Sequence, residues 1–140
     1  MSNLLNVNLL RVLLAGVGSM AVGFLWFSPF LFEKSWLKEM GWTAESMKEK
    51  KKDMQMGKVF GMTFAGSLVT AAALAVLMQR MNLGLAGGLK LAVLLWAGFM
   101  ATVKLNDVLF EAKSKKLFAI DAGHLLAAML VMSIILSLIR

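Results

Sequence analysis

Four long apolar stretches constrain this chain more than any other feature of its sequence. They are 21, 21, 21 and 23 residues long and occupy positions 12–32, 59–79, 83–103 and 117–139. The first two contain no charged side chain, and the other two contain one each, Lys90 and Asp121. A helix that crosses a bilayer needs about 20 predominantly apolar residues. The sequence therefore predicts an all-α, polytopic membrane protein built as a four-helix transmembrane bundle.

The length of the chain limits what else it can contain. Of its 140 residues, 59% are hydrophobic, whereas soluble domains average about 45–50%. Four spans of about 20 residues use most of the chain, so we expect a single transmembrane domain over residues 1–140. Because the third helix continues beyond its apolar core, the predicted spans are about 12–32, 59–79, 83–110 and 117–139.

The one long connection, residues 33–58, predicts short helical segments. Residues 33–40 combine four charged side chains with a tryptophan and two other apolar side chains, which is typical of a helix at a membrane surface. Gly41 can end that helix, and Thr43 can cap a second, highly charged helix that runs to about Met56. We therefore expect an amphipathic and charged helical segment between the first and second spans.

Lysine and arginine side chains indicate how the chain is oriented. Its net charge of +7 is best explained by loops that contact anionic lipid headgroups, and we expect no nucleic-acid partner. The side of the membrane with the first and third connections carries eleven lysines, Lys104 near the end of the third span included, and the opposite side carries four lysines or arginines. Loops rich in positive charge stay in the cytoplasm. This pattern predicts that the 33–58 loop lies inside and that both termini lie outside.

Small side chains recur along the first span. Ala15, Ser19 and Gly23 lie at intervals of four residues, and such rows let membrane helices approach closely. Four helices also offer limited internal surface for a solute path. In addition to contact with the lipid bilayer, we therefore expect a homo-oligomer that uses this row as its contact.

Ionisable side chains gather near the turn between the third and fourth spans. Lys104, Asp107 and Glu111 share one face of the third helix, and Asp121 and His124 share one face of the fourth. The two aspartates are each about seven residues from the turn, and Lys104 and His124 are each about ten. An antiparallel hairpin therefore places each pair at matching depth. The candidate binding cluster consists of Lys104, Asn106, Asp107, Glu111, Asp121 and His124.

Two interpretations of this cluster are open. Charges within a membrane segment are costly and mark functional sites, so the cluster can be a proton, ion or anion site. It can also be a compensated network that only holds the hairpin together. We expect no metal and no other cofactor. The chain has one histidine and no cysteine, and its acidic residues lack a recognised metal-binding spacing.

Two motifs resemble those of a known family. The first is Trp-Phe-Ser-Pro-Phe-Leu-Phe at residues 26–32, and the second combines Leu-Phe-Glu at 109–111 with Leu-Phe-Ala-Ile-Asp-Ala-Gly-His at 117–124. They are similar to motifs of domain of unknown function family 1761, small bacterial membrane proteins with four predicted spans. Phe27 stands where the family pattern has tyrosine, and Asp121 where it often has asparagine. The resemblance implies a bacterial inner membrane but no activity. Its signature residues are Trp26, Ser28, Pro29, Lys34 and Trp36.

The sequence leaves three functions open. The leading one is a small binding or transport-type protein, or an accessory subunit, that uses the polar cluster for a small-molecule or ion ligand. The second is a membrane-structural or scaffolding protein with no transported substrate. The third is a membrane enzyme acting on lipid or quinone, with Asp121 and His124 as an acid–base pair. No nucleophile accompanies that pair, so we assign no catalytic residue.

Overall fold

Helices form all the regular structure in the described part of the chain. The computed structural model describes residues 9–28, 30–53 and 55–138, and within them there is no strand. The elements are α1 (Leu9–Trp26), α2 (Glu33–Met40), α3 (Ala44–Asp53), α4 (Met56–Arg80), α5 (Leu85–Leu95), η1 (Trp96–Met100), α6 (Ala101–Phe110) and α7 (Lys115–Leu138). Four helical runs among these residues can cross a membrane: Leu9–Trp26, Gly57–Arg80, Leu85–Phe110 and Lys115–Leu138. The predicted all-α class with four spans is confirmed, and the chain is a multi-pass membrane protein.

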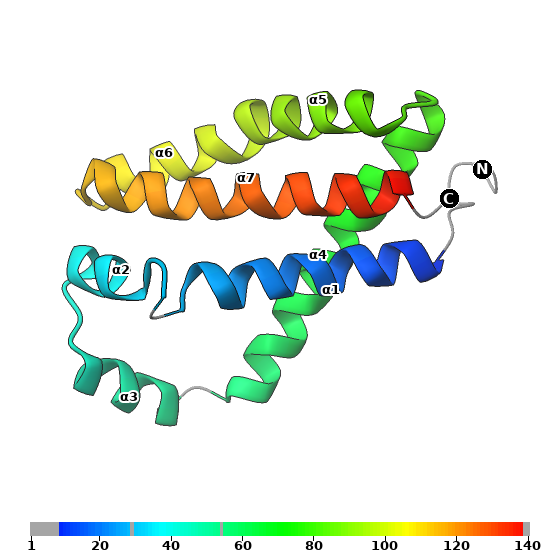
Figure 1. Cartoon of the computed structure of the whole chain (residues 1–140). Coiled ribbons are helices and arrows are strands. Elements are labelled where there is room, and N and C mark those ends of the chain that lie inside the picture. Colours follow the sequence, from blue (N-terminus) through cyan, green and yellow to red (C-terminus); the bar gives the residue numbers. More distant parts are fainter. Residues whose placement is uncertain (1–8, 29, 54, 139–140) are drawn as a thin grey trace.

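Helix α7 lies at the centre of the arrangement (Figure 1). It runs beside α1 on one side and beside α5 and α6 on the other, whereas α4 crosses obliquely behind. The core forms where α1, α4, α5 and α7 meet, and its buried side chains include Ala15, Leu74, Ala92, Met129 and Leu136. Alanines at these positions let the helix backbones approach closely. Such close packing drives helix association in a membrane, where lipid is as apolar as the core.

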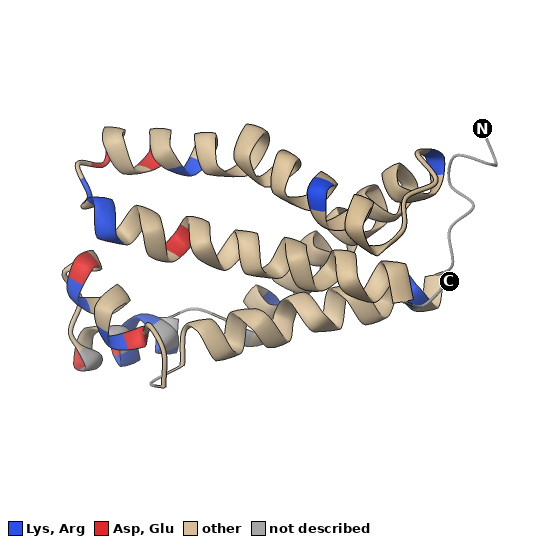
Figure 2. Ribbon diagram, turned by 45° about the horizontal axis from the view of Figure 1, so that its top comes forward, with Lys and Arg blue, Asp and Glu red and all other residues tan. Residues whose placement is uncertain are grey.

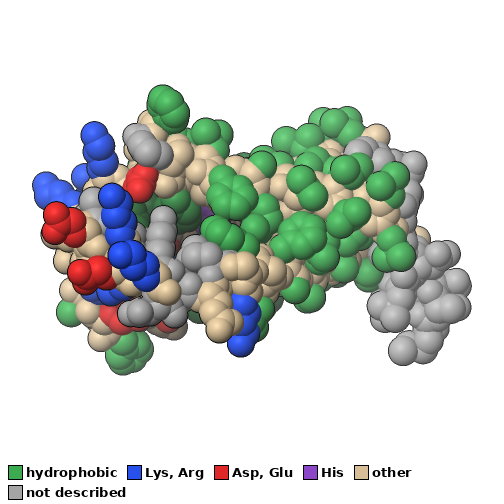
Figure 3. All heavy atoms as spheres, turned by 90° about the horizontal axis from the view of Figure 1, so that it is seen from below, with side chains coloured by type: hydrophobic (Ala, Val, Ile, Leu, Met, Phe, Trp, Pro, Cys, Tyr) green, Lys and Arg blue, Asp and Glu red, His purple; other side chains and the backbone are tan. Residues whose placement is uncertain are grey.

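Charged side chains concentrate at one end of the molecule (Figure 2). That end carries α2, α3 and the turn between α6 and α7, while the described chain ends Leu9 and Leu138 lie at the other end. Hydrophobic side chains cover most of the remaining surface in Figure 3. Phe99 and Val69, for example, are 73% and 70% exposed. An apolar surface of this extent marks contact with a membrane.

The first apolar stretch is not one continuous helix to residue 32. Helix α1 ends at Trp26, because the chain closes a tight turn there. The Ser28 hydroxyl donates a hydrogen bond of 2.6 Å to the Leu25 carbonyl, and the Phe32 amide donates one of 3.1 Å to the Trp26 carbonyl. The signature residue Pro29 lies outside the described residues. The turn redirects the chain so that α2 starts at Glu33 and lies across the charged end of the bundle.

The small-residue row of the first span packs inside the chain. Ala15 has no exposed surface, and the Ser19 hydroxyl lies 3.4 Å from that of Ser67 on α4. A Cβ atom added to Gly23 would lie 3.3 Å from Nε2 of His124 on α7. The prediction that this row contacts a second copy is therefore wrong. The small side chains of the row let α1 pack closely against α4 and α7 of the same chain.

Candidate functional site

Five of the six residues in the predicted polar cluster line one cavity of about 410 Å³. Helix α6 contributes Lys104 and Asp107, Glu111 follows at its end, and α7 contributes Asp121 and His124. The sixth residue, Asn106, is exposed and is not among the lining residues. Apolar side chains of α6 and α7 complete the hairpin's part of the wall, namely Val108, Leu117 and Leu125. The rest comes from parts of the chain that the sequence analysis did not connect with the cluster, through Phe27, Trp36 and Met40.

Asp121 interacts with side chains from other parts of the chain. Its half-buried carboxylate interacts with the Trp36 side chain and is attracted electrostatically by Lys104, while Glu111 repels it. Trp36 belongs to α2, a helix of the polar loop, and Lys104 belongs to the third span. The polar groups of the cavity therefore come from three parts of the chain rather than from the hairpin alone.

Two tryptophans hold the backbone on either side of Asp121. Nε1 of Trp26 donates a 2.9 Å hydrogen bond to the Ile120 carbonyl, and Nε1 of Trp96 donates a 2.7 Å bond to the Ala122 carbonyl. A Cβ atom at Gly123 would lie 3.0 Å from the Trp26 ring, so the absence of a side chain there lets the indole reach α7. These bonds fix the rotation of α7 and with it the direction of the Asp121 side chain.

Trp96 is placed by an irregular turn in the third span. Residues Trp96–Met100 form a π-helix within the otherwise α-helical run Leu85–Phe110. Such turns are rare and occur preferentially at functional sites. The sequence analysis did not predict this turn, because one widened turn barely alters the apolar pattern of a membrane span.

Helix α2 is tied to the turn between α6 and α7. The Ser114 hydroxyl donates a 2.6 Å hydrogen bond to Oε2 of Glu39. The Ser114 hydroxyl oxygen in turn accepts a 3.1 Å hydrogen bond from the Leu117 amide and so caps the start of α7. Ser114 therefore positions both α7 and the helix that carries Trp36. The signature residue Lys34, on the same helix, is exposed.

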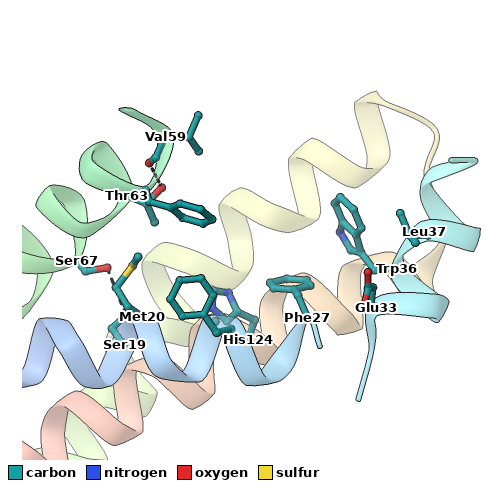
Figure 4. A pocket seen from close by; sticks show the side chains of 13 residues that line it. Ser19, Met20, Phe27, Glu33, Trp36, Leu37, Val59, Thr63, Ser67 and His124 are labelled. Carbon is teal, nitrogen blue, oxygen red and sulfur yellow. Dashed lines mark hydrogen bonds between the residues drawn. The ribbon is translucent and has the colours of Figure 1, made fainter. Parts of the chain in front are cut away.

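A second cavity of about 410 Å³ adjoins the first and lies between α1, α2 and α4 (Figure 4). The two cavities share Phe27, Trp36 and His124 as lining residues. The Phe27 ring centre lies 5.1 Å from that of His124 and 5.8 Å from that of Trp36. The second cavity is lined mostly by apolar side chains, among them Met20 and Phe24. We term the first the polar cavity and the second the apolar cavity.

Metal ligands are not grouped in the part of the chain that the structure describes. No three or more histidine, aspartate or glutamate side chains there stand close enough to hold an ion. The polar cavity instead offers hydrogen-bonding and charged groups beside aromatic rings.

Comparisons with known proteins give one match. The model of a family described as a protein of unknown function (DUF1761) matches residues 10–137. No curated protein and no solved structure matches the chain. The two motifs on which the resemblance rests meet in space at the polar cavity, through the contacts of Trp26 with Ile120 and of Phe27 with His124.

Proposed function

Since this chain belongs to the DUF1761 family of proteins of unknown function, we propose on the geometry of its site that it is a membrane-embedded binding protein for a small molecule. The observation that carries the proposal is the polar cavity. Five ionisable side chains of the α6–α7 hairpin line an open volume of about 410 Å³. Cavities of about 300–1,000 Å³ are typical of small-molecule sites.

The surroundings of the cavity support binding over a purely structural role. A network with a purely structural role would stabilise the hairpin most if its interior were dry and each charge were paired. Buried charges without partners cost free energy. Here α1 and α2 extend the site well beyond the hairpin, with Trp36 and Phe27 as further walls. Aromatic walls with a few placed polar groups are the usual composition of a ligand pocket.

We further propose that the charged end faces the cytoplasm of a bacterial inner membrane. Most lysines lie in the loop with α2 and α3 and around the α6–α7 turn, and both sit at one end of the bundle. The positive-inside rule then places the polar cavity near the cytoplasmic surface and both termini outside.

Single cysteines on α7 test the binding function, because the natural chain has none. Leu125 lines the polar cavity, Ala128 is 5% exposed in the core, and Ile134 is 37% exposed on the apolar surface. With the protein in nanodiscs, we expect a small, permanently charged methanethiosulfonate to modify Leu125→Cys only. If Leu125→Cys reacts as slowly as Ala128→Cys, the cavity is closed to water and the structural alternative holds.

The same variants identify a ligand. Small molecules extracted from cells that express the protein should slow the modification of Leu125→Cys and should be recovered with the purified wild-type protein by mass spectrometry. The matched control is Ile134→Cys, whose low reactivity the extract should leave unchanged.

A homo-oligomer remains part of the proposal, although its contact is not the α1 row. The apolar surface of the chain leaves other helix faces free for association within the membrane. The mass of the protein in nanodiscs measures the state directly, and a strictly monomeric wild type would contradict it.

A further inference from the structure

The two adjoining cavities point to the chemical class of the ligand. We propose that the site takes an amphiphilic cation, with a positively charged head group in the polar cavity and an apolar tail in the apolar cavity. This inference rests on the proposed binding function and adds the charge and shape of the molecule that is bound.

The first argument is a reversal of charge. The whole chain has 15 lysines and arginines against 8 acids, yet among the described residues that line the two cavities Lys104 is the single lysine or arginine, beside His124. The same lining residues include four acids: Glu33, Asp107, Glu111 and Asp121. Half of the acids of a basic protein thus line these two adjoining cavities. Such a site favours a cation over an anion.

The second argument is the aromatic wall between the cavities. The rings of Phe27, Trp36 and His124 line both spaces, and Phe27 lies between the other two at 5.8 and 5.1 Å. Aromatic faces attract organic ammonium groups, most strongly where water is excluded. The Trp36 side chain also interacts with Asp121, so an aromatic ring and a carboxylate stand together where the head group would lie.

The third argument is the apolar cavity itself. Phe24 and Phe60 face each other across α1 and α4 with ring centres 5.5 Å apart, and Met20 and Val59 line the same space. Figure 4 shows Met20 and Val59 on one side of His124, and Phe27 and Trp36 on the other. A tail in this cavity is buried among apolar side chains, and burial of apolar surface is favourable. The head group of the same molecule then lies near the acids of the polar cavity.

Calorimetry in nanodiscs of zwitterionic phosphatidylcholine tests the proposal with three probes. Octyltrimethylammonium has both parts, octanesulfonate has the same tail with the opposite charge, and tetramethylammonium lacks the tail. Empty nanodiscs correct for partition into lipid. We expect octyltrimethylammonium to bind at least about tenfold more tightly than either of the others. Its advantage over octanesulfonate comes from charge attraction and cation–π contact, which contribute about that factor. Its advantage over tetramethylammonium comes from burial of the apolar tail.

Variants locate the bound head group. Asp121→Asn removes the attraction between carboxylate and ammonium and should weaken octyltrimethylammonium binding about tenfold or more. Glu111→Gln should weaken it by a smaller factor, because Glu111 is exposed. The second variant keeps the test valid if Asp121→Asn fails to fold. The matched control Glu49→Gln removes an exposed acid of α3 outside both cavities and should leave the affinity unchanged.

Three results would overturn the proposal: octanesulfonate binding as tightly as the cation, no binding of octyltrimethylammonium, or the same affinity in both carboxamide variants as in the wild type. The reactivity of Leu125→Cys separates these results from a failure of the binding function. If that cysteine is modified and octanesulfonate slows the modification, the site binds ligands and only their charge was assigned incorrectly. If it is not modified, the binding function fails as well.

Discussion

Nε1 of Trp26 donates a hydrogen bond of 2.9 Å to the carbonyl oxygen of Ile120, 94 positions later in the chain. Each residue belongs to one of the two motifs that the chain shares with its family. The bond joins the end of α1 to the part of α7 that carries Asp121 and His124. A contact between distant segments beside a cavity explains why both motifs belong to one site.

Replacing Trp26 with phenylalanine should destabilise the protein modestly. The variant keeps an aromatic ring against Gly123 but removes the donor to Ile120, and one hydrogen bond contributes about 0.5–1.5 kcal/mol net. Trp96→Phe should behave alike, because its bond to Ala122 is 2.7 Å long. Unfolding in mixed micelles measures the loss, and Trp42→Phe in the polar loop serves as control. If all three variants are equally stable, the hydrogen bonds from Trp26 and Trp96 do not contribute to stability as predicted.

Alanine at Gly88 should destabilise the bundle, whereas alanine at Gly66 should not. A Cβ atom at Gly88 would lie 2.7 Å from Oγ of Ser133, which is fully buried, and no heavy atom lies within 4 Å of the corresponding position at Gly66. Because alanine is favoured over glycine in a helix by about 0.5–1 kcal/mol, Gly66→Ala should raise the free energy of unfolding. The opposite order of the two variants would show that α5 and α7 pack differently.

Ser114→Ala should loosen α2 and the start of α7 together. The substitution removes the hydrogen bond to Glu39. It also removes the N-cap of α7, and an N-cap contributes about 0.5–2 kcal/mol to the free energy of unfolding. Hydrogen exchange should therefore rise in Glu33–Met40 as well as at the start of α7. Ser137→Ala is the control, since that hydroxyl only bonds to the Ile134 carbonyl of its own helix. Unchanged exchange in α2 would mean that Ser114 does not hold it.

Cysteine labelling should fix the orientation in the membrane. Glu49→Cys places a thiol on the exposed surface of α3, and Met81→Cys places one at the turn after α4, where Met81 is 56% exposed. If the lysine-rich end is cytoplasmic, an impermeant reagent should modify Met81→Cys in intact cells and Glu49→Cys only after lysis. Labelling in the reverse order would invert the proposed topology.

Local sequence features were enough to predict the spans and the polar hairpin. Each span is set by its own run of apolar residues, because a helix must satisfy its backbone hydrogen bonds within itself when it lies in lipid. The spacing of Lys104, Asp107, Asp121 and His124 also predicts which of them share a face, because helix geometry is regular. The structure places all four around one cavity.

Only the tertiary structure decided what completes that site. Hydropathy could not show that Trp26 and Phe27 reach α7, that α2 brings Trp36 to Asp121, or that the row of Ala15, Ser19 and Gly23 packs within the chain. The reason is physical: lipid tails and helix interiors are about equally apolar, so composition does not tell which face of a span meets another helix. Close packing and a few hydrogen bonds between distant segments make that choice, and they exist only once the helices have assembled.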